Sequence, residues 1–166
     1  MRIMPKRRRL ERKTNYTKRR ALLEHSKSRI IIRKSNKQIT IQYVESKEAQ
    51  DSVKVSVISG ELIKYGWPEA KSGSLKNLAA AYLTGLLFGN NVKNNKALGG
   101  KVILDTGLIR STPGSRVYAA VNGIIDAGIE LPCDKKVFPS KERIENDKVK
   151  EFFNKVKDNV MKGGKK

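Results

Sequence analysis

Three short segments near the start of the chain carry the apolar patterns of β-strands. Residues 29–33 place three isoleucines in a row, which is typical of a strand covered on both faces. Residues 38–44 and 53–58 alternate apolar and polar positions with a period of two, as half-buried strands do. Three valines of the last segment are expected to share its buried face: Val53, Val55 and Val57. The connection at residues 35–37 is short, so the first two strands should form an antiparallel hairpin.

Helical spacing follows in the middle of the chain. Residues 61–65 predict a short helix that glycine and proline stop, and residues 71–74 predict a loop. Residues 75–89 have apolar side chains at every third or fourth position and several small residues, which predicts a largely buried, closely packed helix ended by its last glycine. Residues 101–105 then predict a fourth strand, and residues 114–128 predict another helix.

The order of these elements predicts an α/β fold. A mixed β-sheet of about four strands, in the order β-β-β-α-α-β-α, should carry the helices on it as a two-layer sandwich. We expect a basic N-terminal arm (1–27), an α/β globular domain (28–134) and a lysine-rich, helical C-terminal tail (135–166). The apolar residues of this tail fit either a helix docked on the domain or a helix that orders only on a partner.

Charge is distributed unevenly along the 166 residues, which carry 36 Lys and Arg against 16 Asp and Glu, a net charge of +20. The first 37 residues hold 15 of the basic residues and only two acidic ones, whereas residues 38–134 are nearly neutral. Such a density of one sign cannot lie inside a core, so the segment must be solvated or must lie along a polyanion. A nucleic acid bound through its phosphates is the first hypothesis.

Several other classes of protein are disfavoured. The longest apolar stretch falls short of the about 20 residues that cross a bilayer, and the charged N-terminus does not read as a secretory signal. We therefore expect no membrane partner and a cytoplasmic location. Cys133 is the only cysteine and His25 the only histidine, so we expect no disulfide and no metal site. Neither a cofactor nor a small-molecule substrate is expected.

A metal-dependent nuclease is the strongest enzymatic alternative. Such enzymes hold Mg²⁺ with carboxylates at strand ends, and Asp105 ends a strand here, with Asp126, Glu45 and Glu61 as possible companions. The competing interpretation is that Asp105 forms a turn and Asp126 lies near a helix end. We favour it, because the first strand offers arginines instead of a carboxylate, and we expect no catalytic residue. A DNA-binding protein would also explain the charge, but no helix typical of groove reading is found.

Two segments could bind phosphate without any chemistry. In residues 110–116, backbone N–H groups, hydroxyls and two guanidinium groups could meet one anion, or a serine or threonine could simply cap the next helix. Tyr16, between Lys13 and Lys18, could stack on an exposed base or fold back onto the domain. Both pairs of alternatives stay open at the level of sequence.

Five segments together resemble a known family. They are KTNY at 13–16, RIIIRKSNK at 29–37, ELIKYGW at 61–67, NLAAAYLTGLL at 77–87 and LDTGLIRSTPGSRVYAA at 104–120. In this order, within a match running from about residue 7 to residue 143, they resemble the archaeal and eukaryotic form of the universal large-subunit ribosomal protein L-eighteen. The length of the chain favours the compact archaeal form. Cys133 departs from the pattern, which tends to have a histidine at this position.

The resemblance implies a structural, non-enzymatic component of the large ribosomal subunit. It implies binding to 5S rRNA and adjacent large-subunit rRNA in the central protuberance, beside neighbouring large-subunit ribosomal proteins. We expect the arm to become ordered on binding. The residues expected to contact RNA are Arg7, Arg8, Arg9, Arg12, Lys13, Tyr16, Lys18, Arg19 and Arg20 in the arm, Arg33, Lys34, Asn36 and Lys37 at the hairpin, and Arg110, Ser115 and Arg116 before the last helix of the domain.

Overall fold

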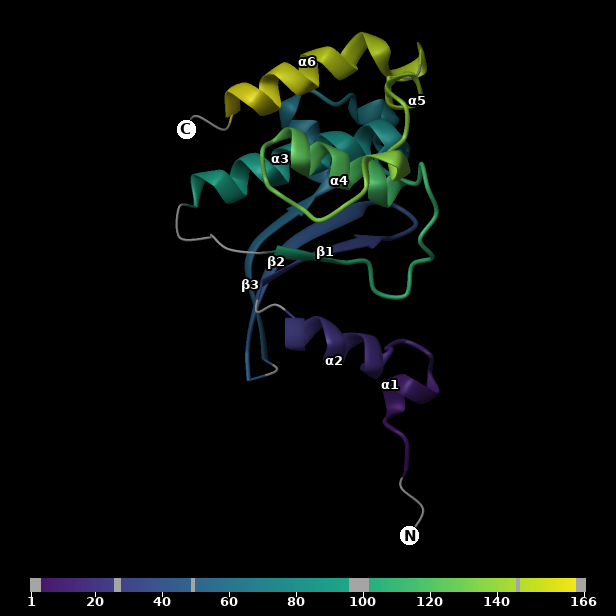
Figure 1. Cartoon of the computed structure of the whole chain (residues 1–166). Coiled ribbons are helices and arrows are strands. Elements are labelled where there is room, and N and C mark those ends of the chain that lie inside the picture. Colours follow the sequence, from purple (N-terminus) through teal and green to yellow (C-terminus); the bar gives the residue numbers. More distant parts are fainter. Residues whose placement is uncertain (1–3, 26–27, 49, 96–101, 146, 164–166) are drawn as a thin grey trace.

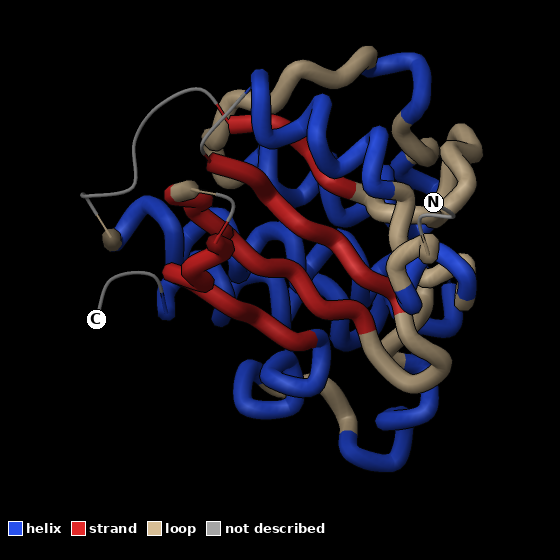
Figure 2. Tube along the Cα trace, turned by 90° about the horizontal axis from the view of Figure 1, so that it is seen from below, coloured by secondary structure: helices blue, strands red, loops and turns tan. Residues whose placement is uncertain are grey.

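The computed structural model describes residues 4–25, 28–48, 50–95, 102–145 and 147–163, and its centre is one mixed sheet. The strands are β1 (Ser28–Lys34), β2 (Ile39–Lys47), β3 (Gln50–Ile58) and β4 (Val102–Asp105), and they lie side by side in the order β3-β2-β1-β4 (Figure 2). β1 pairs antiparallel with β2 and parallel with β4. The predicted α/β class, the mixed sheet and the first hairpin are confirmed; the predicted start of the fourth strand at Lys101 lies outside the described residues.

Alternation along the strands sorts side chains onto two faces, with one exception. In β3, Val55 and Val57 are buried as predicted, but Val53 is 51% exposed. The cause is a β-bulge: Tyr43 pairs with Val55 while the next residue, Val44, pairs with Val53, so one residue of β3 is left over. An extra residue reverses the alternation beyond it, and the prediction that Val53 shares the buried face is therefore wrong.

Helices α3 (Leu78–Asn94), α4 (Arg116–Asp126) and α6 (Asp147–Gly163) are stacked over one face of the sheet (Figure 1). Residues 79–89 of α3 are all buried, which is why this stretch of the helix is nearly all apolar. It starts later than predicted, after the Asn77 side chain accepts a hydrogen bond from the Ala80 amide at 2.7 Å. It also continues past Gly89, since that glycine packs against Ala127 instead of ending the helix.

Shorter helical elements complete the chain: α1 (Arg7–Leu10), α2 (Tyr16–His25), α5 (Lys141–Ile144) and three 3-10 segments, η1 (Ser59–Tyr65), η2 (Glu69–Ser74) and η3 (Lys135–Val137). The predicted short helix is η1, and it ends at Gly66, whose φ of 103° a residue with a side chain rarely adopts. The predicted loop at residues 71–74 is instead part of η2. Among the described helices, none is long and apolar enough to cross a membrane.

The C-terminal helix α6 is docked on the domain, which decides between the two alternatives for the tail. Phe153, Val156 and Val160 are at most 1% exposed. Phe152 packs edge-on against Trp67, with the ring centroids 4.8 Å apart. Because these apolar side chains recur at helical spacing, one face of α6 is inside the core and adds a further layer above α3.

The helices α3 and α4 approach each other at two glycines. A Cβ atom at Gly85 would lie 2.1 Å from the carbonyl oxygen of Ala120, and one at Gly123 would lie 2.1 Å from the carbonyl oxygen of Tyr82. No side chain can occupy that space while both backbones stay in place. The predicted close packing of α3 is thus confirmed, and each glycine makes room for the backbone of the other helix.

We expect Gly85→Ala to lower the free energy of unfolding by about 3 kcal/mol or more, the upper end of overpacking costs, because the added methyl group meets backbone. Urea denaturation measures the change. Gly73→Ala is the matched control: no atom lies within 4 Å of the added group, so the change should stay within about 0.5 kcal/mol. Equal midpoints for the two variants would contradict the close approach.

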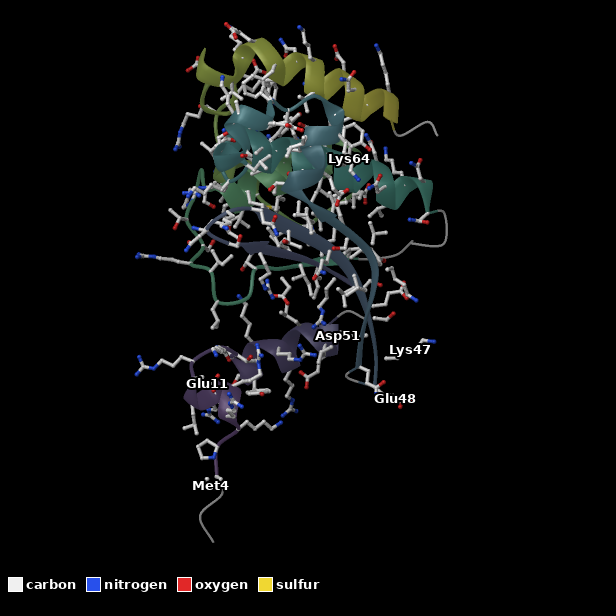
Figure 3. All side chains as sticks on the ribbon, turned by 180° about the vertical axis from the view of Figure 1, so that it is seen from behind. Met4, Glu11, Lys47, Glu48, Asp51 and Lys64 are labelled. Carbon is white, nitrogen blue, oxygen red and sulfur yellow. The ribbon has the colours of Figure 1, made fainter. Side chains whose placement is uncertain are left out.

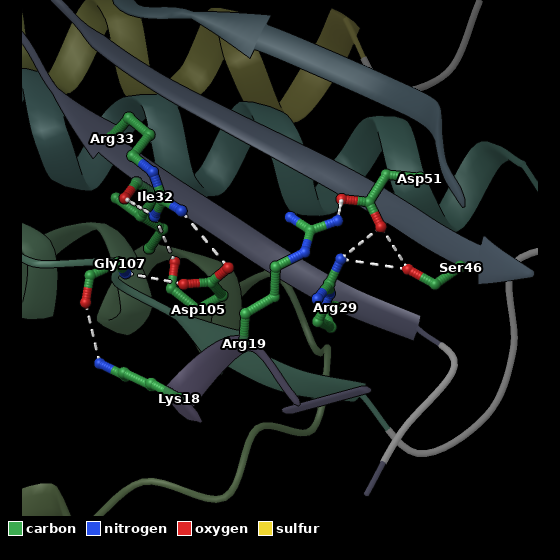
Figure 4. A network of polar contacts seen from close by, with 9 residues as sticks. All are labelled: Lys18, Arg19, Arg29, Ile32, Arg33, Ser46, Asp51, Asp105 and Gly107. Carbon is green, nitrogen blue, oxygen red and sulfur yellow. Dashed lines mark hydrogen bonds and ion pairs between the residues drawn. The ribbon is translucent and has the colours of Figure 1, made fainter. Parts of the chain in front are cut away.

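The opposite face of the sheet carries α2, which polar contacts hold in place (Figures 1 and 4). The carboxylate of Asp51 accepts hydrogen bonds from Arg29 Nη2 at 2.7 Å and from Arg19 Nη2 of α2 at 2.9 Å. Arg29 is only 1% exposed. Ser46 Oγ accepts a hydrogen bond from Arg29 Nη2 and donates one to the Asp51 carboxylate. Asp51 lies beside α2, away from Lys47 and Glu48 at the hairpin tip (Figure 3). One carboxylate therefore fixes an arginine of the sheet and an arginine of the arm.

The charges around Asp51 also set its protonation. Burial raises the pKa of its carboxyl, but the hydrogen bond from Ser46 and the charges of Arg29 and Arg19 outweigh burial, so the pKa lies below its usual value. A lowered pKa stabilises the fold at pH values above the ordinary pKa of aspartate, about 3.9, and this stabilisation is lost as the pH falls through the lower folded value.

We expect Asp51→Asn to lower the free energy of unfolding by about 2–4 kcal/mol at neutral pH, because the buried Arg29 charge would lose its counter-ion. Its loss of stability between about pH 5 and pH 2 should be smaller than that of the unaltered chain, since the titrating group is gone. Thermal unfolding followed by circular dichroism over that pH range measures both effects.

Glu45→Gln is the control for the Asp51 variant. It removes a carboxylate from the same hairpin whose partner, Lys54, is 3.9 Å away and 44% exposed, so the stability should change by less than about 1 kcal/mol. If both variants behave alike, Asp51 does not hold α2 on the sheet.

Candidate nucleic-acid interface

A groove of about 480 Å³, here called groove A, lies between the arm, the end of β1 and the loop that follows β4. Its lining residues are Arg8, Lys13, Thr14, Asn15, Lys18, Arg19, Leu22, Arg33, Lys34, Asp105, Thr106, Gly107, Leu108 and Ile109. Six of these side chains are cationic and one is acidic. The groove therefore gathers positive charge from segments that are about 90 residues apart in the sequence.

Hydrogen bonds join the loop after β4 to α2 and to β1 in groove A (Figure 4). Lys18 Nζ donates to the carbonyl of Gly107 at 2.9 Å, and Arg33 Nη1 donates to the carbonyl of Asp105 at 2.8 Å. The Asp105 carboxylate accepts from the Gly107 amide at 2.7 Å and lies 3.3 Å from Arg33 Nη2. The one acidic side chain among the described lining residues is thus engaged internally, and the other charged side chains that line the groove are cationic.

The first part of the arm folds over a smaller hollow beside groove A, lined by Arg9, Arg12, Thr14, Asn15, Tyr16, Thr17 and Leu108. Tyr16 is half-buried, with Lys6 Nζ 4.7 Å from the centre of its ring. It therefore neither folds into the core nor stands free. Hydrogen bonds from Lys13 and Arg7 lower the pKa of Glu11 in this segment. Sequence patterns did not predict the helices α1 and α2.

A second groove of about 640 Å³, here called groove B, lies on the other side of the same loop, before α4. Arg110, Ser115 and Arg116 line it, as does Lys34, which also lines groove A. Ser115 occupies the N-cap position of α4, but its side chain makes no capping hydrogen bond. The interpretation that a hydroxyl simply caps this helix is therefore not supported at Ser115.

The structure thus brings most of the expected RNA-binding residues together and leaves four outside both grooves and the hollow. Those four are Arg7, Arg20, Asn36 and Lys37. Arg7 and Arg20 form exposed ion pairs with Glu11 and Glu24. A lining residue that sequence patterns did not single out is Arg143, which reaches groove B from α5. Only its charge marked it in the sequence, because its position depends on how the C-terminal segment packs.

Some cationic side chains bind oxygen atoms of the protein, and others have no partner among the described residues. Arg19, Arg29, Arg33 and Lys18 all bind protein oxygens. In the described part of the chain, the side chains without any hydrogen bond or ion pair include Arg9, Arg12, Lys34, Lys37, Arg110 and Arg143. A phosphate can approach the second set without breaking a protein contact, so these residues are the most available for binding phosphate.

Three carboxylates of the nuclease hypothesis each accept hydrogen bonds from a different group of the protein. Asp126 accepts from the Tyr82 hydroxyl at 2.8 Å, and burial together with this carboxylate raises the pKa of Tyr82. Glu61 accepts from the Ile58 amide at 3.0 Å. Among the described residues, no group of three His, Cys, Asp or Glu side chains could hold a metal ion. The Asp105 carboxylate accepts from the amide of Gly107, two residues later, as expected for the turn that we favoured over a catalytic role.

Comparisons with known proteins agree with the pattern of signatures. The family model described as "Ribosomal large subunit proteins 60S L5, and 50S L18" matches residues 2–101 and 93–134. A protein named large ribosomal subunit protein uL18 from Korarchaeum cryptofilum is 43% identical over 152 residues, which cover 92% of this chain and 75% of that protein. The uL18 protein of Methanoculleus marisnigri is 42% identical over 150 residues, or 90% and 82% of the two chains. The chain therefore belongs to the family of large-subunit ribosomal proteins 60S L5 and 50S L18.

Proposed function

We propose that this ribosomal protein binds 5S rRNA and adjacent large-subunit rRNA, as a non-catalytic structural part of the central protuberance beside neighbouring ribosomal proteins. The observation that carries the proposal is groove A, where six cationic side chains from the arm and the sheet surround one internally paired carboxylate. Such a surface fits the phosphates of a folded RNA. Family membership gives the cellular location, the ribosome in the cytoplasm.

Recognition in this proposal depends on backbone shape. The major groove of an RNA helix is too deep and narrow for side chains to read, so phosphates, riboses and unstacked bases are the accessible features. Arg9, Arg12 and Lys34 would bind phosphates, and Tyr16 would stack on an unstacked base, displacing Lys6 from its ring. The arginines already bound to Asp51 and Asp105 would instead hold the surface in shape.

The contacts of α2 bear on how the arm would bind. We expected the arm to become ordered on RNA; in the structure, Arg19 of α2 binds Asp51 of the sheet, and Lys18 binds the loop after β4. Fewer residues then lose conformational freedom on binding, and less interaction energy is spent on ordering them. We infer that α2 presents a preformed surface and that RNA meets groove A without refolding it.

We expect the double variant Arg9→Gln/Arg12→Gln to bind 5S rRNA on the order of tenfold more weakly near 0.15 M salt. Two phosphate contacts would be lost, so the slope of log affinity against log salt should fall by about 1.8 on the duplex coefficient. Filter-binding titrations of a 5S rRNA transcript at several salt concentrations measure both quantities. The free energy of unfolding should not change, because neither side chain has a partner in the described chain.

The control is Lys64→Gln/Lys155→Gln, which removes the same charge from two exposed positions that line neither groove. Figure 3 shows Lys64 far from the arm. Its affinity should change less than twofold. Equal losses in the two double variants would mean that only net charge matters. Competition with another structured RNA and with duplex DNA, in Mg²⁺ and with cleavage monitored, tests the class: preference for DNA, or cleavage, would overturn the proposal.

A further inference from the structure

The charged side chains that line groove B are all cationic among the described residues. Four cationic side chains line it: Lys34, Arg110, Arg116 and Arg143. None of the other residues that line it in the described part of the chain is acidic. Arg116 donates one hydrogen bond, from Nη1 to the carbonyl of Lys76 at 3.1 Å, and the other three make no side-chain hydrogen bond or ion pair with described residues. Like charges gathered without a counter-ion repel one another, so the groove favours an anionic occupant.

Packing fixes the position of Arg143 within groove B. Its neighbour Ile144 is only 3% exposed and anchors α5 in the core. The carbonyl of Val137, just before this segment, accepts a hydrogen bond from the Gly114 amide at 2.8 Å. A Cβ atom at Gly114 would lie 2.8 Å from Arg143 Nη1, so the guanidinium lies directly over this glycine. The C-terminal segment thus holds a free guanidinium against the loop before α4.

Groove B is also continuous with groove A. Lys34 and Ile109 line both grooves, which lie on the two sides of the loop that joins β4 to α4. A polyanion that leaves groove A past Lys34 therefore enters groove B without crossing an acidic surface. A single phosphate would contact only part of this surface, whereas a chain of phosphates can contact both grooves.

We propose that groove B binds the phosphodiester backbone of rRNA through Arg143, which makes the C-terminal segment part of the RNA interface. The inference rests on the proposed function, because it takes the RNA of groove A to continue into groove B. Arg143 and Arg110 each present a planar guanidinium that can donate two parallel hydrogen bonds to a phosphate. Backbone amides in the first turn of α4, which the Ser115 side chain does not cap, would add single N–H donors.

Arg143→Gln tests the inference, with Lys141→Gln as the matched control. Lys141 is exposed, belongs to the same short helix and carries the same charge, but it lines neither groove. In titrations with transcripts of 5S rRNA and of large-subunit rRNA, Arg143→Gln should weaken binding to at least one of them about three- to tenfold. It should also reduce the salt slope by about 0.9, whereas Lys141→Gln should change affinity less than twofold.

Hydroxyl-radical footprinting of the RNA complexes provides a second readout. The unaltered chain should protect two sets of riboses, and Arg143→Gln should lose protection in one set while Arg9→Gln/Arg12→Gln loses it in the other. Arg143→Lys should keep the salt slope, because a lysine keeps the charge, but should lose part of the affinity because its ammonium lacks the planar fork.

The outcomes separate this inference from the proposed function. If the unaltered chain shows no preference for 5S rRNA, the proposed function fails. If it shows that preference, but Arg143→Gln matches Lys141→Gln in affinity, slope and footprint, only the assignment of groove B is overturned. If Arg143→Gln binds both RNAs normally and is retained less well in reconstituted large subunits, groove B contacts a protein and the inference is wrong.

Discussion

The carboxylate of Asp51 holds together the part of the molecule that carries most of the charge. It lies on an edge strand and binds two arginines, Arg29 from inside the sheet and Arg19 from the arm. Within the described chain, Nε and Nη1 of Arg29 are buried without a hydrogen-bond partner, so this guanidinium depends heavily on Asp51 and Ser46. Leaving buried donors unpaired is costly. These unpaired donors lie beside the contact between Asp51 and Arg19, which fixes α2 on the open face of the sheet. Residues of α2 line groove A, so the groove depends on this contact.

The excess of positive charge consequently has two roles in one protein. Arginines and lysines beside the sheet, such as Arg33 and Lys18, bind carbonyls and carboxylates of the protein and shape the grooves. Others, such as Lys34 and Arg110, have no partner in the described chain and remain available. A count of basic residues cannot separate the roles. Mutation of the first kind should change folding as well as binding, whereas mutation of the second kind should change binding alone.

Sequence patterns predicted the sheet and the large helices because those depend on local periodicity and on apolar burial. They failed at two positions: the bulge beyond Val55 exposes Val53, and α3 continues past Gly89, whose small size makes room for Ala127. For the candidate interface, the residues expected to contact RNA include every described cationic residue that lines the two grooves except Arg143. The engagement of Arg19 and the placement of Arg143 could not be predicted, since both depend on segments that are distant in sequence.

Preorganisation has a consequence for specificity. If the whole arm were disordered, it could adapt to many RNA shapes, and its affinity would follow charge alone. With α2 fixed by Asp51 and the loop after β4 fixed by Arg33, the cations of groove A have set positions, and only long side chains must be immobilised, at about 0.5–1.5 kcal/mol each. An RNA whose phosphates do not match these positions gains little from them. Under the proposed function, rigid placement would therefore restrict tight binding to RNAs whose folded shape matches these positions.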